Sequence, residues 1–402
     1  MNKSVRWFLS AVSAMLNGSE VPKPDAELDP AAITDLAAFV HFDNLLYYVK
    51  QSLGLEISAK ESERFAQNVM LDANQSDALS ELLARLSAAG IRVIPLKGSR
   101  LKSLYPLTDM RYMGDIDLLY RGDDGVLLSV MTELGYQVKG WQIGEVHHVF
   151  VRDQISVELH HRLLHPGSPL LDPLETLWER AVPAPEGEGV FDLSPVDFYM
   201  HLISHAVMHM LEGGIGIRTF VDFGLYLRQH PELLCDQALA QALKREGLDT
   251  FEARARHIAA ILLDGKEPSE ADALVLDGLL RSGIFGTAVG LAAREMGRVE
   301  SNGRSASRVK YVLSRLFPSA SGLAYRYPYL RRGGIRCLLY PVFWIRRLFA
   351  ILLHKERRMK IGTGLSAASA VGDAELSALR HEQAYFGVAE LAGKHEVHND
   401  ET

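Results

Sequence analysis

The chain has 402 residues, of which 48% are hydrophobic and 23% charged, with a net charge of −7. This length and balance are those of a globular protein with two or more packed units. The only two cysteines, Cys235 and Cys337, lie far apart, and no stretch of 18 uncharged apolar residues occurs. These features argue against a disulfide scaffold and against a transmembrane span, so we expect a cytoplasmic protein.

The first predicted elements are helices. Apolar residues recur three and four positions apart over residues 31–55 and 75–91, so residues 1–86 are expected to be helical. The first twenty residues follow the same spacing, which favours an amphipathic helix over a signal peptide. Gly90 is placed like a helix C-cap before the apolar strand of residues 91–98. Pro95 within that strand indicates an edge position or an irregular end.

Strands and helices then alternate, and the region ends in a hairpin. A short helix ends at Pro106, a strand covers residues 115–120 and a helix covers residues 126–138. The segments HVFVR and ISVELHHRL flank a turn at Asp153 and Gln154, which predicts two antiparallel strands. This order predicts an α/β or α+β sandwich.

The rest of the chain reads as helical. Ser194, Pro195 and Asp197 form a helix start with an N-cap, a first-turn proline and an acid at the third position. The last forty residues are polar, and we expect a frayed tail beyond about residue 390. The expected regions are a helical region (1–86), a catalytic core (87–190), a helical domain (191–300), a basic amphipathic segment (301–360), and a C-terminal helix with an acidic, disordered end (361–402).

Two aspartates occupy one face of the strand at residues 115–120. Alternate strand residues share a face, so Asp115 and Asp117 point the same way, while Ile116 and Leu118 point into apolar packing. Carboxylates this close repel each other unless a cation lies between them. Mg²⁺, which binds few carboxylates together with substrate phosphates, suits such a pair.

Two further features surround this pair. Gly98 and Ser99 lie between a strand and a helix, where backbone N–H groups suit phosphate oxygens, and Lys97 adjoins them. Glu158 is a third carboxylate within an apolar strand, able to face Asp115 and Asp117 if the two strands are neighbours.

This arrangement resembles the nucleotidyltransferase superfamily, which has a DNA polymerase β-like fold. In detail it resembles a poorly characterised bacterial branch, over about residues 30–230. The matching positions are Leu96-Lys97-Gly98, Tyr105-Pro106, Arg111, Met113, Asp115 to Leu119, Glu158-Leu159-His160, His205, His209, Arg218 and Asp222.

The resemblance implies an α+β fold, with a small mixed β-sheet core flanked by N-terminal and C-terminal helical regions. It also implies transfer of a nucleoside monophosphate from an NTP, with ATP expected first, to a hydroxyl of an acceptor, with release of pyrophosphate. Two Mg²⁺ or Mn²⁺ ions would be held by Asp115, Asp117 and Glu158. The phosphates would be bound by Lys97, Gly98, Ser99 and Arg111, and the candidate acceptor pocket comprises His160, His205, Arg218 and Asp222.

Several alternatives remain open at this stage. Arg111 could instead pair with Asp109 or Asp115. His201, His205 and His209 recur every four residues on one helix face, and two histidine pairs lie near the core, His147-His148 and His160-His161. These histidines allow a zinc site, but helix packing is favoured. The acceptor could be a small molecule, a glycan precursor or a peptide or protein. A nucleic acid is not expected, because the catalytic segment is not basic. The competing functions are a metal-dependent phosphohydrolase and a non-catalytic binding protein.

A basic block stands out within this acidic chain. Residues 304–360 contain fourteen lysines and arginines and one acid, Glu356. The block could be a packed terminal helix with a basic rim, a site for a polyanionic acceptor, or a surface that contacts an anionic membrane through residues 331–360.

Overall fold

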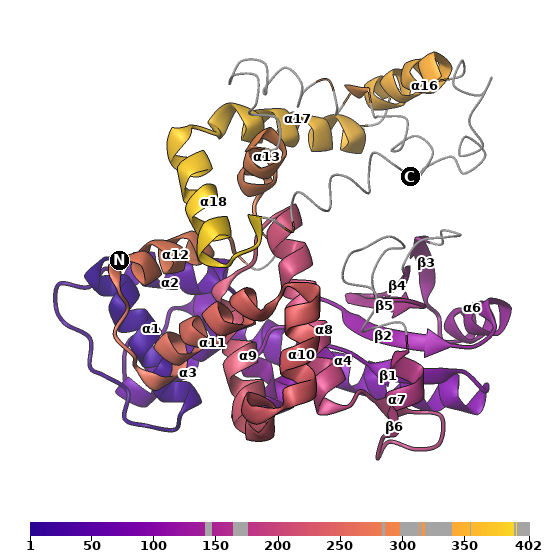
Figure 1. Ribbon diagram of the computed structural model, residues 1–402, viewed down its shortest axis with the longest axis horizontal. Helices are drawn as coiled ribbons and strands as arrows, with labels where there is room; N and C mark the ends of the chain where they lie inside the picture. The colour runs from indigo at the N-terminus through magenta and orange to yellow at the C-terminus, as the bar shows by residue number, and fades with distance from the viewer. Residues whose placement is uncertain are drawn as a thin grey trace. The chain divides into compact units, whose positions relative to one another are not determined.

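The chain folds into the helices and strands of Figure 1, a computed structural model. It describes residues 1–140, 147–163, 176–283, 286–297, 313, 316–317, 340–353, 355–389 and 391. Four helices come first: α1 (Lys3–Leu16), α2 (Pro30–Phe39), α3 (Asp43–Leu53) and α4 (Ala59–Ala88). The longest, α4, starts with a capping box in which Ser58 and Glu61 satisfy each other's backbone N–H groups.

Within the described residues, five strands form one mixed sheet. They are β1 (Arg92–Pro95), β2 (Ile116–Arg121), β3 (Gln137–Gly140), β4 (His147–Arg152) and β5 (Ile155–His160), in the order β1-β2-β5-β4-β3. Strands β2 and β5 are parallel, and the other neighbours are antiparallel. The predicted α+β class with a mixed sheet is therefore confirmed. Strand β1 lies at an edge of the sheet, as Pro95 indicated.

Short elements and helices connect and follow the strands. Between β1 and β3 lie α5 (Gly98–Leu101), η1 (Lys102–Leu104), η2 (Thr108–Met110) and α6 (Asp124–Glu133). After β5 come α7 (Leu177–Arg180), β6 (Val182–Pro183), β7 (Phe191–Asp192), α8 (Pro195–Glu212), α9 (Ile217–Gln229), η4 (Pro231–Cys235), α10 (Gln237–Glu246), α11 (Asp249–Asp264) and α12 (Glu270–Arg281). Helix α8 has the predicted N-cap, because the Asp197 N–H donates to Ser194 Oγ at 3.1 Å.

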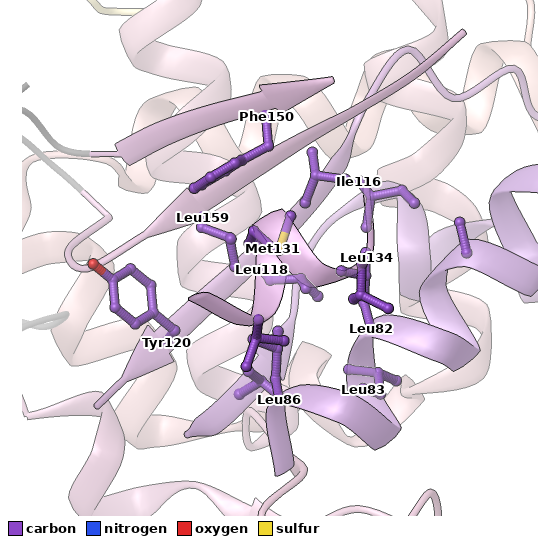
Figure 2. Close-up of a cluster of buried hydrophobic side chains, with 14 of the residues drawn as sticks. Leu82, Leu83, Leu86, Ile116, Leu118, Tyr120, Met131, Leu134, Phe150 and Leu159 are labelled. Atoms are coloured by element: carbon purple, nitrogen blue, oxygen red, sulfur yellow. The ribbon is translucent and has the colours of Figure 1, made fainter. Parts of the chain in front are cut away.

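One face of the sheet is covered by helices α4 and α6. Their apolar side chains pack against those of β2, β4 and β5 in a buried cluster, most of which is drawn in Figure 2. The labelled members are Leu82, Leu83, Leu86, Ile116, Leu118, Tyr120, Met131, Leu134, Phe150 and Leu159. Burial of each such aliphatic or Phe side chain contributes about 1.5–3 kcal/mol, so this face fixes the register of the strands. The intervening residues of β2 and β5 point to the opposite face.

The chain divides into two packed units. The first comprises residues 1–206 and 217–280, and the second comprises residues 207–216 and 281–402. The first unit thus combines the N-terminal helices, the sheet and much of the later helical region, which the sequence had suggested as separate regions. The physical reason is that the last turns of α4 supply part of the core beneath the sheet.

The second unit contains α13 (Ala288–Gly297), α16 (Tyr340–Leu353), α17 (Lys355–Ala370) and α18 (Asp373–Tyr385). A small cluster of buried residues from α13, α17 and α18 forms its core. Helix α16 exposes large apolar side chains, namely Val342, Ile345, Phe349 and Leu353. Most of the predicted basic segment before residue 340, and the predicted frayed end after residue 391, lie outside the described residues. Among the helices described, none has both the length and the apolar character needed to cross a bilayer.

Candidate metal and nucleotide site

The face of the sheet opposite α4 and α6 carries four polar side chains at adjacent positions. Asp117 on β2 is paired in register with Glu158 on the parallel strand β5. On the other side of β5, His147 of β4 is paired with His160 across the antiparallel ladder. Directly paired residues share a face, so these four side chains gather where the three strands meet.

Strand β2 begins at Ile116, so Asp115 lies in the loop just before it and not in the predicted strand, but Asp115, Asp117 and Glu158 converge as the sequence predicted. One ligand oxygen from each carboxylate lies within 4.8 Å of the others. Burial, followed by repulsion from Asp117 and Glu158, raises the pKa of Asp115 to about 6. An unneutralised trio of this kind is costly, and a hard divalent cation with oxygen ligands is the partner that would relieve it.

The carboxylate of Asp117 already interacts with two side chains, those of Lys97 and His160. Its Oδ1 accepts a hydrogen bond from Lys97 Nζ at 3.2 Å and lies 2.9 Å from His160 Nε2. Burial acts to raise the pKa of Asp117, but the Lys97 ammonium and the His160 hydrogen bond outweigh it and hold that pKa well below its usual range. Asp117 therefore stays ionised, as a metal ligand must.

Lys97 is held at this position by an unusual backbone conformation. Its φ is +40° and its ψ is −114°, a region that side-chain-bearing residues rarely adopt. The neighbouring Leu96 N–H donates to the Asp117 carbonyl at 3.0 Å, which fixes the end of β1 beside β2. Strain of this kind costs on the order of 1–3 kcal/mol and is characteristic of functional sites.

Gly98 and Ser99 lie directly after Lys97, at the start of α5. A Cβ on Gly98 would lie 2.8 Å from Met113 Cγ and 2.9 Å from Arg111 Nη1, so any larger residue here would force one of these side chains to move. The Ser99 N–H donates to the Leu96 carbonyl at 3.1 Å and is already used in a turn. Ser99 Oγ, in contrast, is buried and has no hydrogen-bond partner in the described part of the chain. A buried hydroxyl without a partner is uncommon in folded proteins and marks this turn as unusual.

Arg111 makes a buried bidentate pair with Asp222. Its Nε and Nη2 each donate to an Asp222 oxygen at 2.8 Å, and Tyr105 OH donates to the same carboxylate. Asp109, one of the alternative partners, instead accepts hydrogen bonds from side chains of α3. The predicted phosphate residue and the predicted acceptor residue therefore engage each other, which joins the loop before β2 to α9.

Arg218, another predicted acceptor residue, is also buried and internally bonded. Its Nη1 donates to the Tyr112 carbonyl at 2.7 Å, and burial lowers its pKa to about 10. Together with Asp222, Arg218 holds the loop that leads to Asp115.

Of the three histidines on α8, His201 is buried in the protein interior. His201 is 2% exposed, and neither ring nitrogen has a hydrogen-bond partner among the described residues. Burial and then the charge of Lys97 lower the pKa of His201 to about 3, so the imidazole is neutral. The ring of His205 lies 5.9 Å from it. The clusters of described residues that could hold a metal ion do not include the α8 histidines.

From the sequence, His147 was only one of several histidines near the core for which a zinc site was conceivable. In the structure its Nε2 lies 3.6 Å from Glu158 Oε2. The signal was present in the predicted hairpin, because a two-residue turn at Asp153 and Gln154 brings His147 opposite His160.

Comparison with known proteins agrees with this geometry. Residues 26–264 match the profile of a family described as uncharacterised nucleotidyltransferases. Searches of curated proteins and of solved structures gave no significant match. The matched region covers more than half of the chain, including the sheet, all three carboxylates and helices α8 and α9. The chain belongs to this family of uncharacterised nucleotidyltransferases.

Proposed function

We propose that this protein transfers a nucleoside monophosphate from an NTP, with ATP as the first candidate, to a hydroxyl group of an acceptor. The acceptor oxygen bonds to the α-phosphorus, the bond from that phosphorus to the bridging oxygen breaks, and pyrophosphate leaves. The observation that carries the proposal is the convergence of Asp115, Asp117 and Glu158 at the face of the sheet opposite α4 and α6.

The carboxylates fit Mg²⁺ or Mn²⁺, because they offer oxygen ligands, and burial together with their mutual repulsion raises the pKa of Asp115. When bound, such ions neutralise phosphate charge and lower the pKa of the attacking hydroxyl. Asp115 and Asp117 would hold the ion that accompanies the nucleotide, and Glu158 with Asp117 would face the acceptor.

Lys97 and Ser99 are suited to the triphosphate. Lys97 now bonds to Asp117, and a cation that shares the charge of Asp117 would leave the ammonium for a phosphate oxygen. Ser99 Oγ supplies a buried donor that has no partner in the described residues. Gly98 keeps this turn against Met113. Arg111 has two of its three guanidinium nitrogens bound to Asp222, so its contribution to phosphate binding rests on Nη1.

For the acceptor, the candidate side chains are those of α8. His201 is neutral because burial lowers its pKa, and the charges of Lys97, Asp117 and His160 also act on it, which supports a position near the carboxylates. His205, half-buried one turn later, is the predicted pocket residue nearest to it along the helix. Arg218 and Asp222 position the loop before Asp115.

A thermal-shift panel tests the proposal. Each of ATP, CTP, GTP and UTP is added with Mg²⁺ or with EDTA to the wild type and to the Asp115→Asn/Asp117→Asn variant. At 100 times its dissociation constant a nucleotide stabilises the folded protein by about 2.7 kcal/mol. We expect stabilisation of the wild type that requires Mg²⁺, and none of the variant.

The matched control is Asp35→Asn/Asp77→Asn, which removes two exposed helix aspartates and should respond like the wild type. With the nucleotide identified, release of pyrophosphate supports transfer, whereas release of inorganic phosphate would favour the phosphohydrolase. A folded wild type that no NTP stabilises would overturn the proposal.

A further inference from the structure

A second group of metal-competent side chains lies beside the carboxylate trio. His147, Glu158 and His160 each offer a ligand atom, and these atoms lie within 4.8 Å of one another. His147 Nε2 is 3.6 Å and His160 Nε2 is 3.5 Å from the same oxygen, Glu158 Oε2. The three groups come from two paired strands, so the sheet holds them in register.

These separations match those between ligands of one small cation. In a tetrahedral zinc site, metal–ligand bonds of about 2.0–2.1 Å put neighbouring ligand atoms about 3.3–3.5 Å apart. The two histidine–glutamate distances differ from this value by only a few tenths of an ångström. His160 Nε2 also lies 2.9 Å from Asp117 Oδ1, so a cation bound to this nitrogen would replace that hydrogen bond.

The ligand types separate this group from the carboxylate trio. Two imidazoles and one carboxylate form a ligand set used by zinc, and imidazole suits borderline transition-metal ions. Mg²⁺ prefers oxygen ligands at octahedral angles and keeps several waters. Both histidine contacts use Glu158 Oε2, so Oε1 can serve the cation of the carboxylate trio.

We propose that His147, Glu158 and His160 bind a zinc-class divalent cation. This site prefers a different metal from the Mg²⁺-type site of Asp115 and Asp117. The inference rests on the proposed function only in sharing Glu158 with it. Metal binding at this cluster needs neither nucleotide nor turnover, so the two proposals can fail separately.

The test is a titration of the metal-free protein with Co²⁺, a spectroscopic substitute for zinc, followed by visible d–d absorption. Competition with Zn²⁺ and with excess Mg²⁺ is measured on the same samples. We expect one Co²⁺ site per chain that Zn²⁺ displaces and Mg²⁺ does not. His147→Gln should weaken Co²⁺ binding by at least about tenfold and change the spectrum, since it removes a ligand.

Three variants make the test specific. His147 is half-buried, so its replacement preserves folding better than that of the buried His160, and far-UV circular dichroism checks this. Asp115→Asn should keep the Co²⁺ spectrum, because Asp115 is not in this cluster. His230→Gln, which alters a histidine–glutamate pair elsewhere, should behave like the wild type.

The inference is overturned if the wild type binds no Co²⁺, or if His147→Gln binds it with unchanged affinity and spectrum. It is also overturned if Asp115→Asn abolishes the signal while His147→Gln retains it. Absence of Mg²⁺-dependent NTP stabilisation would refute the proposed transfer and leave the Co²⁺ result standing.

Discussion

Replacing Asp115 by asparagine should stabilise the metal-free protein near pH 8, although it removes a proposed metal ligand. Burial and two neighbouring carboxylates raise the pKa of Asp115 from 3.8 to about 6. A difference of this size costs the ionised form about 3 kcal/mol in the folded protein. Because Asp115 keeps some contact with water, we expect the free energy of unfolding to rise by about 1–3 kcal/mol.

The pH dependence follows from the sign of this change. Between about pH 4 and pH 6 the folded protein holds the Asp115 proton more tightly than the unfolded chain does. The wild type therefore loses stability as the pH rises through this window, whereas the asparagine variant lacks that loss. The advantage of the variant should be full above about pH 7 and vanish below about pH 4.

Urea unfolding in EDTA at several pH values, followed by far-UV circular dichroism, measures the effect. For a chain of this size the midpoint should move by at most about 1 M. Asp77→Asn, at an exposed position in the middle of α4, is the control and should change stability by less than about 0.5 kcal/mol. The reasoning would be refuted if the Asp115→Asn variant were no more stable than the wild type at pH 8. It would also be refuted if the stability gained by the variant were as large at pH 4 as at pH 8.

Three further predictions concern other parts of the chain. Asp222→Asn should destabilise the protein by about 3–5 kcal/mol in urea, because it leaves the buried Arg111 guanidinium without its carboxylate; a loss below about 1 kcal/mol would contradict this. Gly98→Ala should lower the free energy of unfolding by about 1–3 kcal/mol, because the new Cβ contacts Met113. An unchanged stability in the same urea series would contradict this and would mean that the Met113 side chain moves aside. If α16 contacts an anionic membrane, Phe349→Asp should weaken co-sedimentation with phosphatidylglycerol vesicles about tenfold, and equal binding by both proteins would exclude that contact.

The carboxylate cluster and the strands that carry it were within reach of sequence reasoning. Period-two alternation placed Asp115 and Asp117 on one face, and a two-residue turn at Asp153 and Gln154 fixed the hairpin that carries Glu158. Both signals are local, because strand alternation and turn chemistry depend on residues adjacent in the sequence. The family resemblance then linked these segments.

Long-range pairing was beyond that reasoning. The Arg111–Asp222 pair joins residues 111 positions apart, and no local pattern distinguishes a phosphate-binding arginine from one committed to a buried aspartate. Gly98 was interpreted as a phosphate-binding backbone position, which stays a prediction, and nothing in the sequence indicated that Met113 and Arg111 occupy the space where its side chain would lie. The division at residue 87 reflected a change in periodicity, which carries no information about which helix covers the sheet.

Helix α4 has a consequence for how this protein can be dissected. It covers the sheet with leucines, and the buried Gln75 donates to the Met113 carbonyl at 2.9 Å, two residues before Asp115. A fragment starting at residue 87 would expose the underside of the sheet and release the loop that carries Asp115. The smallest piece that retains the site therefore begins before α4, and fragments for binding studies or crystallisation need to include that helix whole.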